Sequence, residues 1–398
     1  MPENKHRDHR ELGQEMDLFS FHDVAPGTVF WHGKGMIIWR VLEKYLRDKL
    51  DKEGYEEVST PIMVKKSLFE KSGHWEHYQK NMFTLEVEKE IYALKPMNCP
   101  ESTLIYSSRV RSYRDLPIRL SEITGRIHRN ELSGTLGGLL RVRQMAQDDA
   151  HIYVRPDQIE EEITKLMEFI KEFYGLINMP LSFNLATRPD DAMGDPAIWK
   201  KAEEALDNVL KKTKVKYKID EKEGAFYGPK IDIKATDSQN REFAIATIQL
   251  DFQTPERMDL YYVDENGDRK QPIMIHRAII GTFERFIGIL LEHFDGALPF
   301  WLSPVQVQIL TINDKVLDYA NKITAELKSK NIRIELDSRN ESIGKKIREA
   351  ELQRIPYLLV IGEKEASAGK VAVRERGKGD LGAMGLEEFL DKCAKNQK

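Results

Sequence analysis

Cysteine is scarce in this chain: Cys99 and Cys393 are the only two among 398 residues. Two cysteines so far apart make no disulfide framework, so we expect a reducing compartment and a cytoplasmic protein. A run of about 18 apolar residues is also absent, so we expect no membrane partner. The charged start, MPENKHRDHRELGQEMDLF, is unlike a secretory signal peptide and too acidic for a good transit peptide.

The sequence lacks a strong excess of positive charge as well. A formal net charge of −4 argues against a protein that coats nucleic acid nonspecifically. The charge is unevenly spread, because the residues after 300 hold 18 Lys and Arg against 15 Asp and Glu, whereas the first 300 hold 43 against 50. The C-terminal part is therefore the candidate to contact a polyanion.

Apolar periodicity predicts two differently organised regions. Before residue 300, the pattern predicts helices over 36–50, 157–177 and 283–294, and strands over 217–237, 241–253 and within 116–154. It also predicts a strand over 55–63 that Pro61 ends or interrupts. After GALPFWLSP it predicts strands over 305–312, 332–337, 356–362 and 370–376 that alternate with helices over 316–331 and 342–354. We predict an α+β fold: residues 1–298 form an antiparallel sheet of six or seven strands flanked by helices, 299–304 a linker, and 305–398 a small α/β domain.

One expected strand has the composition of a ligand-binding surface. If residues 141–153 are extended, one face carries Arg141, Arg143, Met145, Gln147, Asp149 and His151. A solvated strand face would look the same, so this pattern alone leaves both interpretations open. The preceding strand ends in a second polar cluster, RIHRNE. Two arginine-rich segments joined by a glycine-containing loop suit an anionic ligand.

These segments resemble a known family. RIHRNELSG…GLLRVRQMAQDDAHIY and IHRAIIGTFERFIGILLEHF resemble motifs 2 and 3 of class II aminoacyl-tRNA synthetases, and STPIM resembles motif 1. GHWEHY, KPMNCP, DLPIRLSEI, EGAFYGPKID and GKVAVRERGKGDLG narrow the resemblance to the threonyl-tRNA synthetases, from DHRELG to the end of the chain. The resemblance implies a class II sheet, an anticodon-binding α/β domain and a homodimer through the motif 1 region. It also implies a ligase that forms threonyl-adenylate from threonine and ATP and transfers threonine to tRNA(Thr).

The resemblance implies one zinc ion per subunit, held by Cys99, His151 and His276. Taken singly, a cysteine such as Cys99 is more often a buried thiol, and each histidine is more often an ordinary polar residue. Together they supply three zinc ligands and leave an open coordination position. Threonine and valine have nearly the same shape, and an apolar pocket separates them poorly. In the family, zinc binds the threonine hydroxyl directly, and valine is excluded because it has no hydroxyl to bind the ion.

The remaining site residues also follow from the resemblance. In the family, the arginine at position 129 of this sequence contacts the α-phosphate of ATP, and Arg285 matches an arginine that contacts the γ-phosphate and adenine. His74 matches a histidine that helps to move a proton during transfer to tRNA. Mg²⁺ is expected to accompany ATP. The residues expected to contact ATP are Arg129, Glu131, Arg141, Met145, Gln147, Gln249 and Arg285. Those expected to contact threonine are Met97, Asp149, Tyr227, Lys230 and Thr247, and those expected to contact the anticodon are Asn340, Arg348, Glu365 and Arg374. Taken singly, the arginines would be read as surface ion pairs. The sequence departs from the usual family pattern at Glu101, Ser102, Met145 and Ala244.

Two other functions are compatible with the same fold. A threonine-activating paralogue that serves a carrier or peptide pathway need not keep the anticodon residues, yet all four are present. A non-catalytic regulator or RNA-binding relative should have lost ATP-binding arginines or zinc ligands, and these too are present. We therefore expect the ligase.

We expect the chain, as the only protein present, to charge tRNA(Thr) with serine as well as threonine. The resemblance does not include the N-terminal domains of standard bacterial members, one of which hydrolyses Ser-tRNA(Thr). Serine keeps the hydroxyl and lacks one methyl group, a difference worth about 10- to 200-fold in discrimination. Either the chain is an engineered fragment, or its cell relies on a separate trans-editing protein. Charging rates measured with each amino acid test this, and serine charging far below that range would contradict it.

Overall fold

The computed structural model describes residues 7–123 and 125–396, which fall into two compact units. We call residues 22–29 and 46–286 the sheet unit, and the described parts of 1–21, 30–45 and 287–398 the terminal unit. Helices α2 (Gly33–Lys52) and α9 (Phe283–His293) have residues in both. Among the described residues, the helices fall short of the length and apolar character that a membrane span needs.

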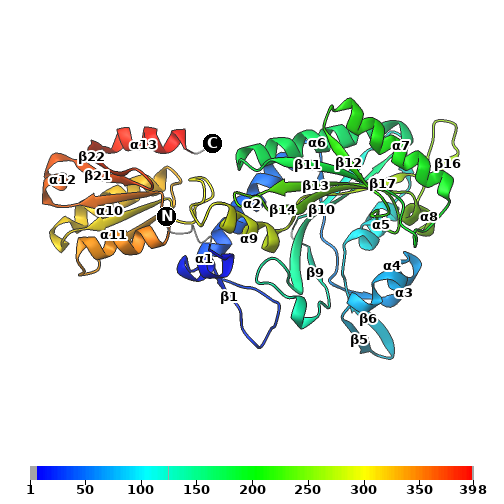
Figure 1. Ribbon diagram of the computed structural model, residues 1–398, viewed down its shortest axis with the longest axis horizontal. Coiled ribbons are helices and arrows are strands. Elements are labelled where there is room, and N and C mark those ends of the chain that lie inside the picture. Colours follow the sequence, from blue (N-terminus) through cyan, green and yellow to red (C-terminus); the bar gives the residue numbers. More distant parts are fainter. Residues whose placement is uncertain (1–6, 124, 397–398) are drawn as a thin grey trace. The chain divides into compact units, whose positions relative to one another are not determined.

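A nine-stranded sheet forms the centre of the sheet unit (Figure 1). Its strand order is β12-β11-β13-β14-β17-β10-β8-β3, and β9 pairs with β10. The strands are β3 (Glu56–Glu57), β8 (Ile118–Glu122), β9 (Arg126–His128), β10 (Gln144–Val154), β11 (Leu181–Ala186), β12 (Tyr217–Asp220), β13 (Lys230–Thr236), β14 (Glu242–Asp251) and β17 (Ile273–Thr282). Only the β11–β12 and β3–β8 pairs are parallel. The predicted antiparallel sheet is confirmed, but it has nine strands where six or seven were expected, and β11 and β17 lie outside the segments predicted to be strands.

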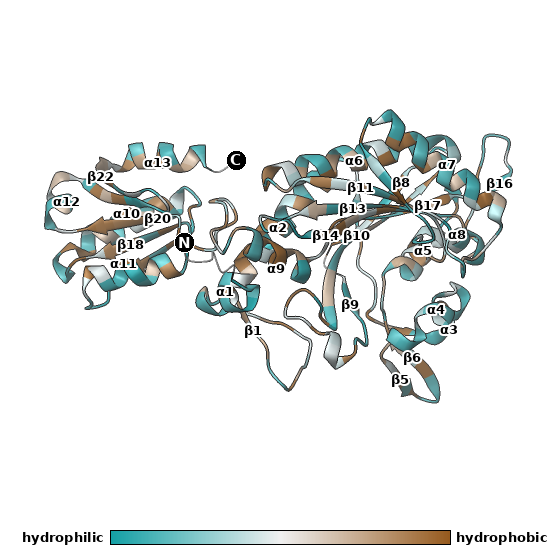
Figure 2. Cartoon of the chain, in the orientation of Figure 1, coloured by the Kyte–Doolittle hydropathy of each residue, from teal (hydrophilic) through white to brown (hydrophobic). Residues whose placement is uncertain are grey.

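Two helices cover one face of this sheet (Figure 1). Helix α6 (Ile159–Leu176) contacts β14, and helix α7 (Pro196–Lys212) contacts α6, β11 and β13. Their inner sides are buried and apolar, and Figure 2 shows polar residues along their outer sides. Helix α6 was predicted, whereas α7 was not, although Asp195 caps its first turn by accepting a hydrogen bond from the Ala197 N–H and Pro196 starts it.

Smaller elements complete the sheet unit. They are the sheet of β4 (Met63–Lys65), β5 (Thr84–Val87) and β6 (Glu90–Leu94), the sheet of β7 (Arg111–Ser112), β15 (Tyr262–Val263) and β16 (Arg269–Lys270), and the helices α3 (Lys66–Lys71), α4 (His74–Tyr78), α5 (Cys99–Ser107) and α8 (Gln253–Arg257). The strand predicted over 55–63, which Pro61 was expected to end or interrupt, is broken between β3 and β4. There the Thr60 N–H donates to the Glu122 carboxylate instead of to a strand, and Pro61 has no N–H to donate.

A β-bulge sets the register at the centre of the sheet. Gln147 of β10 pairs with Thr282 of β17, but Asp149 pairs with Ala278, so three residues of β17 lie opposite one of β10. That one residue, Asp148, accepts hydrogen bonds from the Ile279 and Ile280 N–H groups through its carboxylate. Beyond the bulge the pairing is regular and brings His151 opposite His276. The strand predicted over 141–153 begins at Gln144 in the structure, so Arg141 and Arg143 lie before it.

The terminal unit contains the predicted α/β domain. Its five-stranded sheet has the order β19 (Ile334–Asp337), β18 (Val307–Thr311), β20 (Tyr357–Ile361), β21 (Lys370–Glu375) and β22 (Gly379–Gly385), and its first three strands are parallel. The other elements are α1 (His9–Glu15), β1 (Phe19–Ser20), β2 (Phe30–Trp31), α10 (Leu317–Ser329), α11 (Ile343–Leu352), α12 (Glu363–Ala368) and α13 (Leu386–Lys395). Cys393 lies buried in the core beside Phe389, which accounts for this second cysteine without a chemical role.

Removing the carboxylate of Asp148 should strongly destabilise the sheet unit. Asp148 and Arg277 are both fully buried, with 3.4 Å between the Asp148 Oδ2 and Arg277 Nη1 atoms. Asp148→Ala leaves that guanidinium without its counter-ion and the bulge N–H groups without acceptors, so we expect a loss of about 3–5 kcal/mol in the free energy of unfolding. Urea unfolding measures it. Asp157→Ala, which removes the exposed partner of Arg155, is the control and should cost about 1 kcal/mol or less; equal losses would contradict the assignment.

Candidate active site

The register of the central strands gathers predicted site residues into two rows. One row crosses β10, β17, β14 and β13 through His151, His276, Gln249 and Lys230. The second row, two residues along the strands, consists of Asp149, Ala278, Thr247 and Asp232. Because strand side chains alternate in direction, both rows lie on the same face of the sheet.

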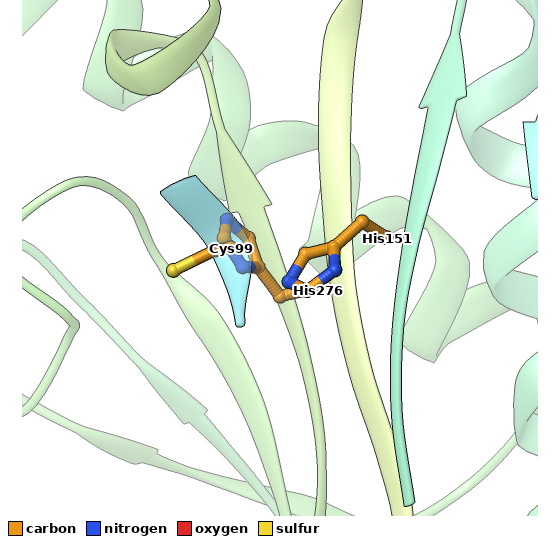
Figure 3. A group of neighbouring side chains, drawn as sticks. All are labelled: Cys99, His151 and His276. Carbon is orange, nitrogen blue, oxygen red and sulfur yellow. The ribbon is translucent and has the colours of Figure 1, made fainter. Parts of the chain in front are cut away.

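Cys99 joins the first row from a different part of the chain. Helix α5 begins at Cys99, with Pro100 in its first turn, a position that suits proline. One ligand atom each from Cys99, His151 and His276 lies within 4.8 Å of the other two, and all three residues are buried. Figure 3 shows the two imidazoles on neighbouring strands with the thiol beside them. The structure therefore brings together the three residues predicted to bind metal.

Neighbouring groups fix the orientation of the two imidazoles. The His276 Nε2 atom lies 2.9 Å from an oxygen of Asp251, a fully buried carboxylate that also accepts the Gln253 and Thr254 N–H groups. The His276 ring is thus left with one nitrogen for a ligand, as in metal sites where a carboxylate orients a histidine. The rings of His151 and His276 meet edge to face, with 5.0 Å between their centroids.

In the absence of a cation, Cys99, His151 and His74 are uncharged. Burial, together with the nearby Asp149 and Glu101 carboxylates, raises the pKa of the Cys99 thiol, and burial lowers the pKa of His151. Burial also lowers the pKa of His74 to about 4. The His74 Nε2 atom lies 3.1 Å from the Cys99 sulfur, and its Nδ1 atom lies 3.0 Å from the Ser72 hydroxyl. Because that hydroxyl donates to the Phe69 carbonyl, it accepts from Nδ1, and Nε2 is left to accept the thiol proton.

This donor set fits a zinc ion. One sulfur and two imidazole nitrogens, all buried, match the ligands that zinc takes and differ from the all-oxygen sites of magnesium and calcium. A divalent cation would also offset the cost of burying a thiolate, since a coordinating thiol loses its proton. Three protein ligands leave one position of a tetrahedral site for a substrate atom.

A chain of hydrogen bonds runs across the sheet beside the triad. The Tyr227 hydroxyl donates to the Gln249 side-chain oxygen, the Gln249 amide donates to Thr247 (3.2 Å), and the Thr247 hydroxyl donates to Asp232 (3.3 Å). The Lys230 ammonium lies 2.6 Å from the Asp232 carboxylate. The Tyr227 ring also stacks on His276, with 4.8 Å between their centroids. Three of the predicted threonine contacts thus belong to one connected network beside the triad.

The other two predicted threonine contacts lie near the triad. Asp149 is buried, and its carboxylate accepts a hydrogen bond from the Asn98 amide at 3.0 Å. The same carboxylate lies 3.8 Å from the His151 Nε2 atom. Met97 is half-buried against the apolar cluster that contains Cys99.

A basic pocket of about 410 Å³ lies where β10 and α9 begin. Five of the seven predicted ATP contacts line it: Arg129, Glu131, Arg141, Met145 and Arg285. The other two lie elsewhere: Gln147 pairs with Thr282, which lines the pocket, and Gln249 lies in the row of His276. Burial, with a contribution from Arg141, lowers the pKa of Arg285, so an anion bound here would relieve the repulsion between the two guanidiniums.

The four predicted anticodon contacts lie in the terminal unit. Asn340 follows β19 and Arg348 is on α11, and both are exposed. The Glu365 carboxylate accepts a hydrogen bond from the Gly362 N–H and so caps α12. Arg374, on β21, lines a pocket of about 300 Å³, 3.8 Å from Glu351 of α11. The structure thus spreads these residues over several elements and does not gather them into one pocket.

Sequence reasoning missed three residues that hold the site together. Asn98 binds Asp149, Asp251 orients His276, and Asp232 ends the hydrogen-bond chain. For Asp251 a signal exists, because an Asp before polar residues and a proline, as in LDFQTP, is typical of the start of a helix. Asn98 and Asp232 carry no such local signal, since their role depends on tertiary contacts.

Comparisons with known proteins agree with this geometry. Residues 83–294 match the family "tRNA synthetase class II core domain (G, H, P, S and T)", and residues 306–396 match the "Anticodon binding domain". The chain is 50% identical over 392 residues to a threonine–tRNA ligase of Clostridium tetani and 51% identical over 390 residues to one of Clostridium botulinum. These matches cover 98% of the chain but only 61% of each relative.

Two solved structures share the fold. A chain described as the RNA binding domain of threonyl-tRNA synthetase from Cryptosporidium parvum matches with a TM-score of 0.94 and 41% identity, over 98% of both chains. A chain described as a threonyl-tRNA synthetase, ThrRS-1, from Aeropyrum pernix matches with a TM-score of 0.85 and 28% identity, over 98% of this chain and 96% of its own.

Glu101 should make the stability of the protein depend on pH. It is 3% exposed, and neither of its carboxylate oxygens has a hydrogen-bond partner among the described residues. Burial raises its pKa from 4.5 to about 8. The folded protein then holds a proton that the unfolded chain releases across this range, so the free energy of unfolding falls as the pH rises from about 4.5 to about 8.

Glu101→Gln keeps the shape of the side chain and removes its titration. We expect the variant and the wild type to have similar melting temperatures at pH 5, and the variant to melt higher at pH 8. A shift of several pKa units corresponds to a few kcal/mol at most. Thermal unfolding at the two pH values measures this. A wild-type Tm that falls no more than that of the variant would show that the carboxylate is solvated or paired in solution.

Proposed function

The chain belongs to the threonyl-tRNA synthetase family of class II aminoacyl-tRNA synthetases, and on that premise we propose that it activates threonine with ATP and transfers it to the 3′ end of tRNA(Thr). The convergence of Cys99, His151 and His276 is the observation that carries this proposal. Because the chain spans 61% of the length of its curated relatives, the activity, substrates and partners are all proposed for this chain and not taken from the relatives.

Cys99, His151 and His276 would hold Zn²⁺, which supplies a Lewis acid able to bind the hydroxyl and amino groups of threonine. Asp149 is positioned by Asn98 to accept a hydrogen bond from the substrate hydroxyl. Tyr227 and Lys230, held by the hydrogen-bond chain, border the space in which the amino acid would lie. A substrate without the hydroxyl would leave the buried Asp149 carboxylate with the hydrogen bond from Asn98 alone, and the loss of the second hydrogen bond discriminates against valine far better than shape does.

Arg129, Arg141 and Arg285 would bind the triphosphate of ATP–Mg²⁺ in the basic pocket. The apolar residues Met145, Leu139 and Val142 in the same lining suit the adenine ring. The threonine carboxylate is already a nucleophile, so these residues accelerate adenylate formation by aligning it with the α-phosphate and by stabilising the charge that develops there and on the leaving diphosphate.

The terminal unit would bind the anticodon of tRNA(Thr). The match of residues 306–396 to the anticodon-binding family supports this. Exposed side chains such as Asn340 and Arg348 suit bases whose edges are open to hydrogen bonding. In the sheet unit, the buried His74 stays the candidate for moving a proton during transfer to tRNA. The same anticodon-family match favours the ligase over a paralogue that serves a carrier protein.

We propose a cytoplasmic homodimer, paired through the region of Pro61. Ile62, Met63 and Ile91, which lie on or beside the sheet of β4, β5 and β6, are each more than 40% exposed. Neighbouring apolar side chains exposed to this extent are typical of an interaction surface.

Pyrophosphate exchange tests the function. With ATP–Mg²⁺, we expect threonine to support exchange, serine to support it within about 10- to 200-fold of threonine, and valine to be weaker by about 10⁴-fold. Treatment with 1,10-phenanthroline, which leaves Mg²⁺ in solution, should abolish threonine-dependent exchange, and added Zn²⁺ should restore it. Equal exchange with valine, or full activity in a protein shown to be metal-free, would contradict the proposal.

The two cysteines provide a matched pair of variants. Cys99→Ala should lose the zinc measured in the purified protein by mass spectrometry and should lose threonine-dependent exchange. Cys393→Ala removes an equally buried thiol from the core of the terminal unit and should keep both. The dissociation constant for ATP should stay unchanged in both variants, because neither cysteine lines the basic pocket. Zinc retained by Cys99→Ala would overturn the ligand assignment.

A further inference from the structure

We propose that Arg143 is the positioning residue that holds the segment Arg129–Arg143, which connects β9 to β10, in the shape that binds ATP. This inference rests on the proposed function, because it concerns the pocket assigned above to ATP. Arg143 does not line that pocket, whereas Arg129, Glu131 and Arg141 do. Any effect of Arg143 on ATP must therefore pass through those neighbours.

The side chain of Arg143 donates hydrogen bonds to three acceptors that lie on two separate stretches of the chain. Its Nε atom donates to the Glu131 carbonyl (2.9 Å), its Nη2 atom to the Ser133 hydroxyl (3.2 Å) and its Nη1 atom to the Pro26 carbonyl (3.3 Å). The acceptors Glu131 and Ser133 lie in the limb that leaves β9. Pro26 lies in residues 22–29, which we call the strap.

The backbone of Arg143 adds a further link on each side. Its N–H donates to the Gly27 carbonyl at 2.7 Å, and its carbonyl accepts from the Arg129 N–H at 2.8 Å. One residue thus joins both limbs of the connecting segment to the strap. Apolar contacts support the same junction, because Val29 of the strap packs against the buried cluster of Ile127, Val142 and Met145.

The consequence for the pocket follows from its geometry. The Glu131 carboxylate lies 2.8 Å from the Arg141 guanidinium, so the backbone position of Glu131 determines where Arg141 can reach. Arg143 fixes that backbone position through the Glu131 carbonyl, and it fixes Arg129 through the backbone pair. Without the side chain, Glu131 and the Arg141 guanidinium paired with it would sample several positions, and ATP would have to order them on binding.

The chemistry of the residue suits this task. A guanidinium presents its donors in a rigid planar fork, so it can bind three acceptors that lie in different directions at once. A lysine ammonium is a compact point donor on a flexible stem and cannot reach all three in this arrangement. We therefore expect Arg143→Lys to restore only part of what Arg143→Met loses.

The test measures ATP binding separately from folding and from threonine chemistry. Isothermal titration with ATP–Mg²⁺ should show a dissociation constant roughly 10- to 100-fold higher for Arg143→Met than for the wild type, and an intermediate value for Arg143→Lys. In pyrophosphate exchange, the KM for ATP should rise by the same factor, while the KM for threonine changes less than about threefold. The control is Arg155→Met, which removes another arginine that donates to a backbone carbonyl, that of Tyr113, and should change neither constant.

A second variant covers the case in which Arg143→Met does not fold. Gly27 has φ +76°, and a Cβ atom there would lie 3.0 Å from the side chain of Leu136 and 3.1 Å from that of Arg143. Gly27→Ala should therefore push the strap away from the segment and raise the dissociation constant for ATP without altering any residue of the pocket.

The outcomes separate this inference from the proposed function. An unchanged dissociation constant in folded Arg143→Met, or a lower Tm with no change in ATP binding, would overturn the positioning role. A wild-type protein that binds ATP but shows no threonine-dependent exchange would overturn the proposed function alone. If the wild-type protein binds no ATP, both the positioning role of Arg143 and the proposed function are contradicted.

Discussion

The pairing of β10 with β17 is the constraint on which the site depends. His151 and His276 lie opposite one another only because three residues of β17 face Asp148 and the carboxylate of Asp148 satisfies the N–H groups freed there. A shift of the strand register by one residue would turn one imidazole to the other face of the sheet, and the three ligands would no longer lie together. Two further pairings, of β14 with β17 and of β13 with β14, align Gln249 and Lys230 with His276, so the polar network lies in the same row as the histidines.

Buried ion pairs surround the site. The Lys95 ammonium, fully buried, lies 2.9 Å from Glu122 and also donates to the Thr60 hydroxyl, while Arg277 lies against Asp148. Such pairs add little net stability, but removing one member leaves a costly unpaired charge. They therefore specify one arrangement of the strands around the triad more strongly than apolar packing would.

The larger elements could be predicted from the sequence, because each carries its own periodic pattern. Helix α6 shows regular apolar spacing and β14 is rich in apolar residues, whereas β17 was not predicted, because His276 and Arg277 interrupt its apolar run. Helix α7 was missed although its cap is visible in the sequence, and β22, rich in glycine, lacks the β-branched residues of a typical strand. The bulge at Asp148 could not be predicted, since no local pattern reports how two distant strands pair.

The triad marks the limit of reasoning from residues alone. Cys99, His151 and His276 lie far apart in sequence, and only the family resemblance connected them before the structure placed them together. Their partners show the same limit: Asn98 and Asp232 acquire a role only through side chains that lie far from them along the chain. The arginines of the basic pocket were easier to recognise, because two of them flank one glycine-containing loop.

The path of the chain between the two units limits how the molecule can be divided. The polypeptide passes from one unit to the other after residues 21, 29, 45 and 286, so neither unit is a continuous stretch of sequence. A fragment that starts at residue 299 would omit α1 and the first turns of α2, which belong to the terminal unit. Truncation at that point would therefore remove part of the terminal unit, because residues 30–45 and the described part of 1–21 pack with the segment that follows residue 286.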